Sequence, residues 1–163
     1  KDRLTYSGYF GRDFLEMEFD DDQGGGFGID FDWGNYTSGL KWRHVPNTRF
    51  HSVTSLYHTN YDWDLNAAIT QTDTLDDGGS YESEINYLEE VSLQDWTLKE
   101  ELNYYATDQH KITAGFELKN INMKTYQKIE DITFINQDRN VNIFGVYLQD
   151  KWKISQLLSS QAG

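Results

Sequence analysis

The sequence predicts an all-β protein, an antiparallel up-and-down meander. Three observations support this fold class. Apolar and polar residues alternate with period two through nearly every patterned stretch, which is typical of strands. Aromatic residues make up 15% of the 163 residues, and this excludes an acidic disordered tail, because such tails are poor in aromatic side chains. Short and long polar connections also follow one another in regular alternation along the chain.

The first half of the chain contains three predicted strands, at 4–19, 28–43 and 49–65. In the first, the alternation changes phase near Gly11, which predicts a β-bulge. One face of the second strand carries Tyr36, Ser38, Leu40 and Trp42. One face of the third carries Val53, Tyr57, Tyr61 and Trp63.

The second half contains strands at 86–105, 111–126 and 139–155, and a seventh is expected to start at Leu157. The first of these has a helical alternative, because 87–105 is rich in Leu and Glu. Period two is nevertheless favoured by Trp96, Leu98, Leu102 and Tyr104. The other two strands alternate through Ile112, Ala114, Phe116 and Leu118, and through Phe144, Val146, Leu148, Trp152 and Ile154.

The connections indicate how the sheet is used. Short turns are predicted at 44–48, at 107–110 and near Ser155–Gln156. Long polar loops are predicted at 20–27, 66–84 and 127–139. All long loops then leave one end of the sheet, as in outer-membrane β-barrels and unlike Greek-key sandwiches. The meander is therefore expected to form part of a transmembrane outer-membrane β-barrel.

Aromatic residues stand next to the predicted short turns. Trp42, Tyr104, Tyr105 and Trp152 are expected to form the girdle at the membrane interface. The residues expected to face lipid are Trp42, Val53, Tyr57, Leu98, Leu102, Ile112, Phe116, Phe144, Leu148 and Trp152. Those expected to face the lumen are Lys41, Lys99, Glu117, Tyr147, Gln149 and Lys151. Glu100 is an exception, because its acidic side chain falls on the predicted lipid face.

Composition excludes several other classes of protein. A formal charge of −13 argues against a nucleic-acid partner, whose binding surfaces are basic. The chain has no cysteine, so disulfides and thiolate metal sites are impossible. The carboxylate pairs Glu16/Glu18 and Glu82/Glu84 could in principle serve a glycosidase, but no aromatic cleft accompanies them. We therefore expect no enzyme, no cofactor and no metal centre.

The predicted 66–84 loop is the best candidate for ligand capture, because specificity usually resides in loops. Its candidate ligand-contacting residues are Asp73, Asp76, Asp77 and Tyr81. Acidic groups beside apolar ones would suit a neutral or cationic ligand.

Three sequence motifs resemble the barrel strands of TonB-dependent outer-membrane receptors. One is a strand with Tyr147, Gln149, Asp150, Trp152 and Ile154, and the others are the hairpin 95–115 and a hairpin formed by 40–42 and 53–57. The resemblance implies an importer of scarce nutrients in the bacterial outer membrane, for a metal chelate, a vitamin or a glycan. It also implies contact with outer-membrane lipid, and with a TonB-type energy-coupling protein through a plug domain that cannot be placed here. Such barrels have 22 strands, so 1–163 is expected to be a single barrel segment.

Two alternatives remain open on the sequence alone. The first is a soluble all-β carbohydrate-binding module, a lectin-like sandwich that stacks sugars on exposed Trp and Tyr side chains. The second is an enzyme on a jelly roll.

Overall fold

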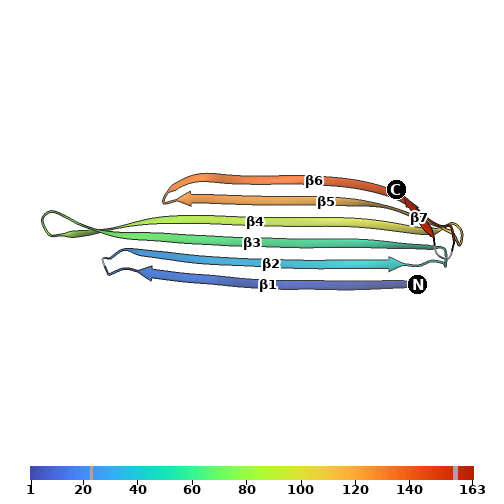
Figure 1. Cartoon of the computed structure of the whole chain (residues 1–163), viewed down its shortest axis with the longest axis horizontal. Coiled ribbons are helices and arrows are strands. Elements are labelled where there is room, and N and C mark those ends of the chain that lie inside the picture. The colour runs from blue at the N-terminus through green and yellow to red at the C-terminus, as the bar shows by residue number, and fades with distance from the viewer. Residues whose placement is uncertain (23, 156–157) are drawn as a thin grey trace.

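The structure, a computed structural model, describes residues 1–22, 24–155 and 158–163. These residues form one seven-stranded antiparallel sheet, in which strand order follows chain order (Figure 1). The strands are β1 (Asp2–Asp20), β2 (Gly26–His44), β3 (Phe50–Thr74), β4 (Ser80–Tyr105), β5 (His110–Ile129), β6 (Ile132–Lys153) and β7 (Ser159–Ala162). The predicted all-β meander is confirmed, and so is the strand prediction for 86–105.

The predicted seventh strand is present as β7, which pairs with β6 between Asp150 and Lys153. Gln156 and Leu157, which the sequence assigned to the last turn and the start of this strand, lie outside the described residues. Figure 1 shows β7 at the end of the sheet where the short turns and the N-terminus lie. We call this the short-turn end, and the opposite end the tip end.

Two of the three long loops were predicted wrongly. The structure continues the strands through most of 66–84 and 127–139, which leaves connections at 75–79 and 130–131. The connection at 21–25 makes up most of the predicted loop 20–27. Cross-strand pairing satisfies backbone N–H and C=O groups even where the side chains are Thr, Asp, Ser and Gln, so pairing overrides weak β-propensity. In Figure 1 the β3–β4 hairpin projects beyond the other strands at the tip end.

The bulge expected near Gly11 is also absent. β1 and β2 pair without interruption from Asp2↔His44 to Asp20↔Gly26. The register irregularity in the pairings lies instead between Gln127 and Lys128 on β5. The phase change near Gly11 therefore has another cause, which appears when the two faces of the sheet are compared.

The sheet has no apolar core of its own. Among the described residues no apolar side chain is buried, whereas Asn103 is fully buried and Ser55 is 4% exposed. A sandwich needs two packed layers, and the described residues form one. The two faces of this single layer therefore need an environment that the chain itself does not supply. No helix long and apolar enough to span a membrane occurs in the described residues.

Candidate functional site

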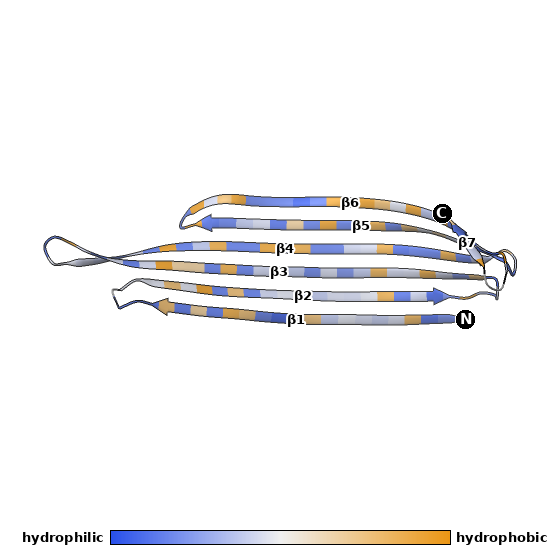
Figure 2. Cartoon of the chain, viewed as in Figure 1, coloured by the Kyte–Doolittle hydropathy of each residue, from blue (hydrophilic) through white to orange (hydrophobic). Residues whose placement is uncertain are grey.

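The strand register divides the side chains between two faces. Trp42 pairs with Leu4 and Thr54, and the same row continues through Glu100, Phe116 and Val146. Even-numbered residues of β1 to β6 therefore share one face, up to the irregularity on β5. We call this the belt face, and the other face, which carries the odd-numbered residues, the opposite face. In Figure 2 the alternation appears as orange and blue segments along each strand.

An apolar belt crosses the belt face toward its short-turn end. Its members are Leu4, Tyr6, Phe10, Tyr36, Leu40, Trp42, Phe50, Leu56, His58, Trp96, Leu98, Leu102, Tyr104, Ile112, Ala114, Phe116, Leu118, Phe144, Val146, Leu148 and Trp152. Most of the large side chains among them are exposed, with values from 37% for Tyr36 to 72% for Phe10. A continuous exposed apolar surface of this extent indicates contact with another apolar phase.

The belt runs obliquely across the strands. The row of residues paired with Trp42 crosses β4 at Glu100 and β6 at Val146. The short-turn edge of the belt lies four residues beyond this row at Tyr104 and six residues beyond it at Trp152, in both cases toward the short turns. The tip-side edge drifts in the same direction, from Tyr36 through Trp96 to Phe144. With a rise of about 3.3 Å per residue and strands about 4.8 Å apart, each edge makes an angle of about 35–45° with the line perpendicular to the strands.

Three of the four predicted girdle residues lie together. Trp42, Tyr104 and Trp152 stand on the belt face at its short-turn edge. Tyr105 lies on the opposite face, where the Lys111 ammonium is 5.9 Å from its ring centroid. Adjacent residues on a strand point to opposite faces, so Tyr104 and Tyr105 cannot share one surface.

Val53 and Tyr57 were assigned to the wrong face. The pairing places Val53 beside Arg43 and Glu101, and Tyr57 beside Gly39, all on the opposite face. A Cβ atom added at Gly39 would lie 2.9 Å from Cδ1 of Tyr57, so the tyrosine ring occupies the space that the glycine leaves open. The other residues assigned to lipid lie on the belt face, and those assigned to the lumen lie on the opposite face.

A hydrogen-bonded network joins three strands on the opposite face. Thr113 donates to Asn103 Oδ1 at 3.0 Å, and Asn103 Nδ2 donates to Glu101 Oε1 at 2.8 Å. Tyr147 on β6 donates to Glu101 Oε2 on β4 at 3.2 Å, passing over Gly115 on β5. A Cβ at Gly115 would lie 2.6 Å from the Tyr147 hydroxyl oxygen and 2.5 Å from a backbone oxygen. The glycine is therefore what allows the tyrosine to span β5.

Glu100 is one of two charged residues within the belt. The other is Asp150, which lies between Leu148 and Trp152 and beside His110. Oε2 of Glu100 accepts a hydrogen bond from Thr54 Oγ1 at 2.5 Å. The pairing also places Glu100 beside Phe116. The threonine, itself on the belt face, partly satisfies the carboxyl group.

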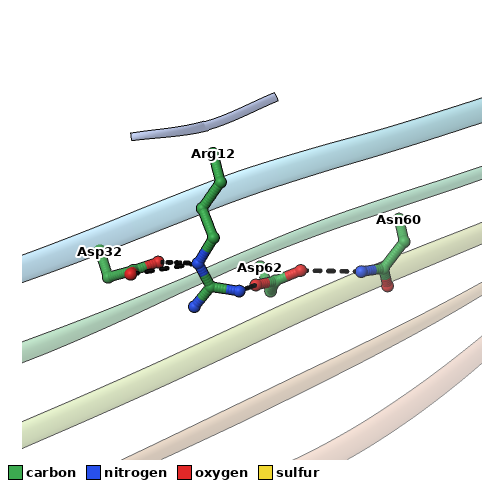
Figure 3. A network of polar contacts seen from close by, with 4 residues as sticks. All are labelled: Arg12, Asp32, Asn60 and Asp62. Atoms are coloured by element: carbon green, nitrogen blue, oxygen red, sulfur yellow. Dashed lines mark hydrogen bonds and ion pairs between the residues drawn. The ribbon is translucent and has the colours of Figure 1, made fainter. Parts of the chain in front are cut away.

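The polarity of both faces reverses toward the tip end. On the belt face, Arg12 Nε lies 2.7 Å from Asp32, and Arg12 Nη1 lies 3.9 Å from Asp62 (Figure 3). Asn60 Nδ2 donates to Asp62 at 2.8 Å. Asp64 pairs directly with Asp32 and Glu90. Burial, followed by the charges of Asp62 and Asp32, raises the pKa of Asp64.

The opposite face becomes apolar over the same part of the sheet. Phe31 stacks on Trp33 with ring centroids 4.8 Å apart, and meets Trp63 edge-on at 5.5 Å. Further apolar residues there are Leu15, Met17, Ile29, Leu65, Val91, Leu93, Ile121, Met123, Val141 and Ile143. This reversal explains the phase change near Gly11. The sequence did not predict an apolar patch on this face, although the phase change near Gly11 marks the point where apolar residues move from one face to the other.

The four predicted ligand-contacting residues lie on the β3–β4 tip. Asp73 pairs with Tyr81, and Asp73 accepts a hydrogen bond from Gln71 Nε2 at 3.1 Å. Asp77 accepts one from the Gly79 backbone N–H at 3.0 Å, which supports the turn. Asp76 lies in the same turn. The four residues are placed on one hairpin but do not converge, and no group of three or more potential metal ligands is found in the described residues.

Comparison with solved structures identifies a similar fold. The ferric yersiniabactin uptake receptor FyuA from Yersinia pestis matches with a TM-score of 0.57 and 14% identity. The match covers 94% of this chain and 23% of the receptor, so the chain spans about a quarter of that protein. The alcaligin outer-membrane receptor FauA from Bordetella pertussis matches at a TM-score of 0.39 and 10% identity, over 95% of this chain and 31% of that receptor.

No protein-family model matches the sequence. A search of curated proteins gave no match either. At this level of identity the likeness to FyuA shows the fold alone: a run of antiparallel strands such as occurs in the barrel of an outer-membrane receptor.

Proposed function

We propose that this chain is a section of the barrel wall of a TonB-dependent type of receptor in the bacterial outer membrane. The oblique apolar belt is the observation that carries the proposal. Membrane barrels tilt their strands by about 35–45°, and an apolar band that lies level in the bilayer must then cross the strands at that angle. Both edges of the belt have this slope and the same direction.

The width of the belt also suits a bilayer. It spans seven residues on β1, from Leu4 to Phe10, and nine on β3, from Phe50 to His58. A tilted transmembrane strand needs about 9–11 residues, interfacial residues included. Aromatic side chains at both edges, such as Trp42 and Trp96, are what interfacial girdles require. The belt face then contacts outer-membrane lipid, and the tips project outside the membrane.

In this arrangement the opposite face lines the lumen. The network of Asn103, Glu101 and Tyr147 belongs to a polar wall. The wall would serve uptake of a large scarce nutrient, such as a metal chelate, a vitamin or a glycan. Coupling to a TonB-type protein would reach it through a plug domain elsewhere in the receptor. The whole of 1–163 acts as one wall segment in this proposal.

The alternative functions have less support. A lectin-like sandwich requires a two-layer core, and the described residues form a single layer without a buried apolar side chain. The paired carboxylates Glu16/Glu18 lie on the acidic tip half of the belt face, opposite Asp30 and Gly28. The hollow that these glutamates line is shared with Asp30, Glu84 and Glu130, so it is an acidic surface hollow. The extended apolar belt has no part in glycoside hydrolysis, so a non-enzymatic role is the better proposal.

The five tryptophans provide a direct test. Trp42, Trp96 and Trp152 lie on the belt, whereas Trp33 and Trp63 lie on the opposite face toward the tips. Five variants, each retaining one tryptophan and replacing the others by Phe, would be folded into vesicles containing brominated lipids. We expect strong quenching of the three belt tryptophans and weak quenching of the other two, which serve as matched controls. Equal quenching of all five, or quenching of Trp33 and Trp63 alone, would refute a membrane role for the belt.

A further inference from the structure

Like charges lie directly opposite each other at two places on the opposite face. Arg3 pairs with Arg43 across β1 and β2, and Lys111 pairs with Lys151 across β5 and β6. Like charges in directly opposed positions destabilise an antiparallel pair. Both pairs lie near the short-turn end, where β2 and β6 end at His44 and Lys153.

None of the four cations forms an ion pair with a described carboxylate, although Lys111 attracts the charge of Glu101 at longer range. Nearby acids have other partners: Lys119 lies 2.6 Å from Asp95, and Glu101 accepts from Asn103 and Tyr147.

The charge of this region is opposite to that of the whole chain. Between the belt's two edges and one residue beyond each, the opposite face carries eight cations against three carboxylates, in a chain whose formal charge is −13. The cations are Arg3, Lys41, Arg43, Lys99, Lys111, Lys119, Lys151 and Lys153, and the acids are Asp95, Glu101 and Glu117. The remaining acidic residues lie mainly in the tips and on the tip half of the belt face. The sheet therefore concentrates positive charge on one surface.

The spacing of the two pairs indicates the size of the partner. Four strand spacings separate Arg43 on β2 from Lys151 on β6. The row of residues paired with Arg43 reaches β6 at Tyr147, and Lys151 lies four residues further along β6. At about 4.8 Å per strand and about 3.3 Å per residue, the two sites are about 23 Å apart. One small anion cannot contact both, but the surface of a polypeptide can.

We propose that the short-turn half of the opposite face is a docking surface for an acidic polypeptide, whose carboxylates lie against Arg3/Arg43 and Lys111/Lys151. Between these pairs the face carries Glu101, Thr113 and the Tyr147 hydroxyl, with Val53 as an apolar member, whereas Asn103 is fully buried, so the contact is mainly polar and hydrated. The inference rests on the proposed function only in calling this surface a lumen wall.

The test measures binding of labelled glutamate peptides to the full chain in zwitterionic detergent micelles, by fluorescence anisotropy. The probes are a 20-residue polyglutamate, tetraglutamate and a 20-residue polyglutamine. Tetraglutamate spans at most about 14 Å and cannot bridge the two pairs. The double variants are R3Q/R43Q and K111Q/K151Q, and the matched control is K124Q/K128Q, which removes the same charge from the belt face near the tips.

We expect polyglutamate to bind more tightly than either other probe. Each pair variant should weaken its binding by about tenfold or more, because one arm of a bivalent contact is lost. The control should change it less than twofold, and R3K/R43K should retain it, which also shows that charge rather than folding is responsible.

Three results would overturn the proposal. Polyglutamate could bind no better than polyglutamine, all three double variants could weaken binding equally, or tetraglutamate could bind as tightly as the long peptide. The last result would assign two separate small-anion sites instead. The tryptophan quenching pattern does not depend on these cations, so it reports failure of the wall proposal separately.

Discussion

The short-turn half and the tip half of the same strands assign opposite polarity to the two faces. In the short-turn half, the belt face is apolar and the opposite face carries cations and a polar network. In the tip half, the belt face carries Arg12 and Asp32, and the opposite face carries Phe31 and Trp63. The backbone register is continuous between the halves. The difference teaches that a strand can keep its pairing while the polarity of its two faces reverses along its length.

The largest expected effect tests the belt directly. Leu98 lies in the middle of the belt between Leu56 and Leu118, and Leu88 lies on the same strand and face in the tip half. Leu98→Arg should lower the free energy of unfolding in lipid vesicles by about 2–4 kcal/mol, because it places a charge in the apolar band. Leu88→Arg should cost less than about 1 kcal/mol. Equal losses in reversible urea unfolding would remove the distinction between the halves.

Glycine substitutions compare tight and open positions in the two halves. A side chain at Gly115 would meet a backbone oxygen at 2.5 Å and Tyr147, whereas a Cβ at Gly28 in the tip half meets nothing within 4 Å. Gly115→Ala should destabilise the fold by about 1–3 kcal/mol through overpacking. Gly28→Ala should stay within about 0.5 kcal/mol of the parent. The two variants are compared by the midpoints of their denaturant unfolding. A Gly115→Ala variant as stable as the parent would contradict the close contact at this position.

Two asparagines separate a buried polar network from an exposed one. Asn103 is fully buried between Thr113 and Glu101, and Asn60 is half-buried beside Asp62 in the tip half. Asn103→Ala removes the acceptor of Thr113 and one of the two donors to Glu101, which retains Tyr147, and should cost about 1–2 kcal/mol. Asn60→Ala should cost less, since water can reach Asp62. A larger loss for Asn60→Ala in the same unfolding assay would reverse the ranking.

The smallest effect depends on pH and concerns the acidic row of the tip half. The pKa of Asp64 is raised above its ordinary value of 3.8, first by burial and then by Asp62 and Asp32. The folded state therefore binds more protons than the unfolded state, and stability falls as pH rises through the interval just above 3.8. Asp64→Asn should stabilise the protein at pH 7 by about 0.2–1 kcal/mol. The gain should vanish below the ordinary Asp pKa, and a gain that persists there would exclude this cause.

The sequence was sufficient for the parts of the fold that depend on local alternation. The strands and most of the belt followed from period two, because successive residues of a strand alternate between its two faces. The hairpin arms at 66–74 and 80–84 did not follow, because their polar residues are held by pairing between strands rather than by intrinsic preference. Tyr57 was misplaced for a related reason: an aromatic ring lies over Gly39 on the polar face, and only the register reveals that neighbour.

The features of the candidate site divide in the same way, into those that the local sequence predicts and those that depend on strand register. The placement of Trp42, Tyr104 and Trp152 near the short turns was predicted from the sequence, and their role as a membrane girdle stays a prediction. The basic pairs Arg3/Arg43 and Lys111/Lys151 were not, because residues 40 apart in the sequence become neighbours only through a register that composition does not specify. Overall acidity concealed them as well, since a net charge does not report how charge is distributed between two faces.

The hydrogen bond from Tyr147 to Glu101 has a mechanical consequence. It ties β6 to β4 across the intervening strand, so these strands cannot slide past each other without breaking it. Gly115 lies beneath the ring and keeps the tie flat against the sheet. Force applied along one strand would be shared among three. A single hydrogen bond that spans three strands thereby makes a one-layer sheet more resistant to sliding of its strands.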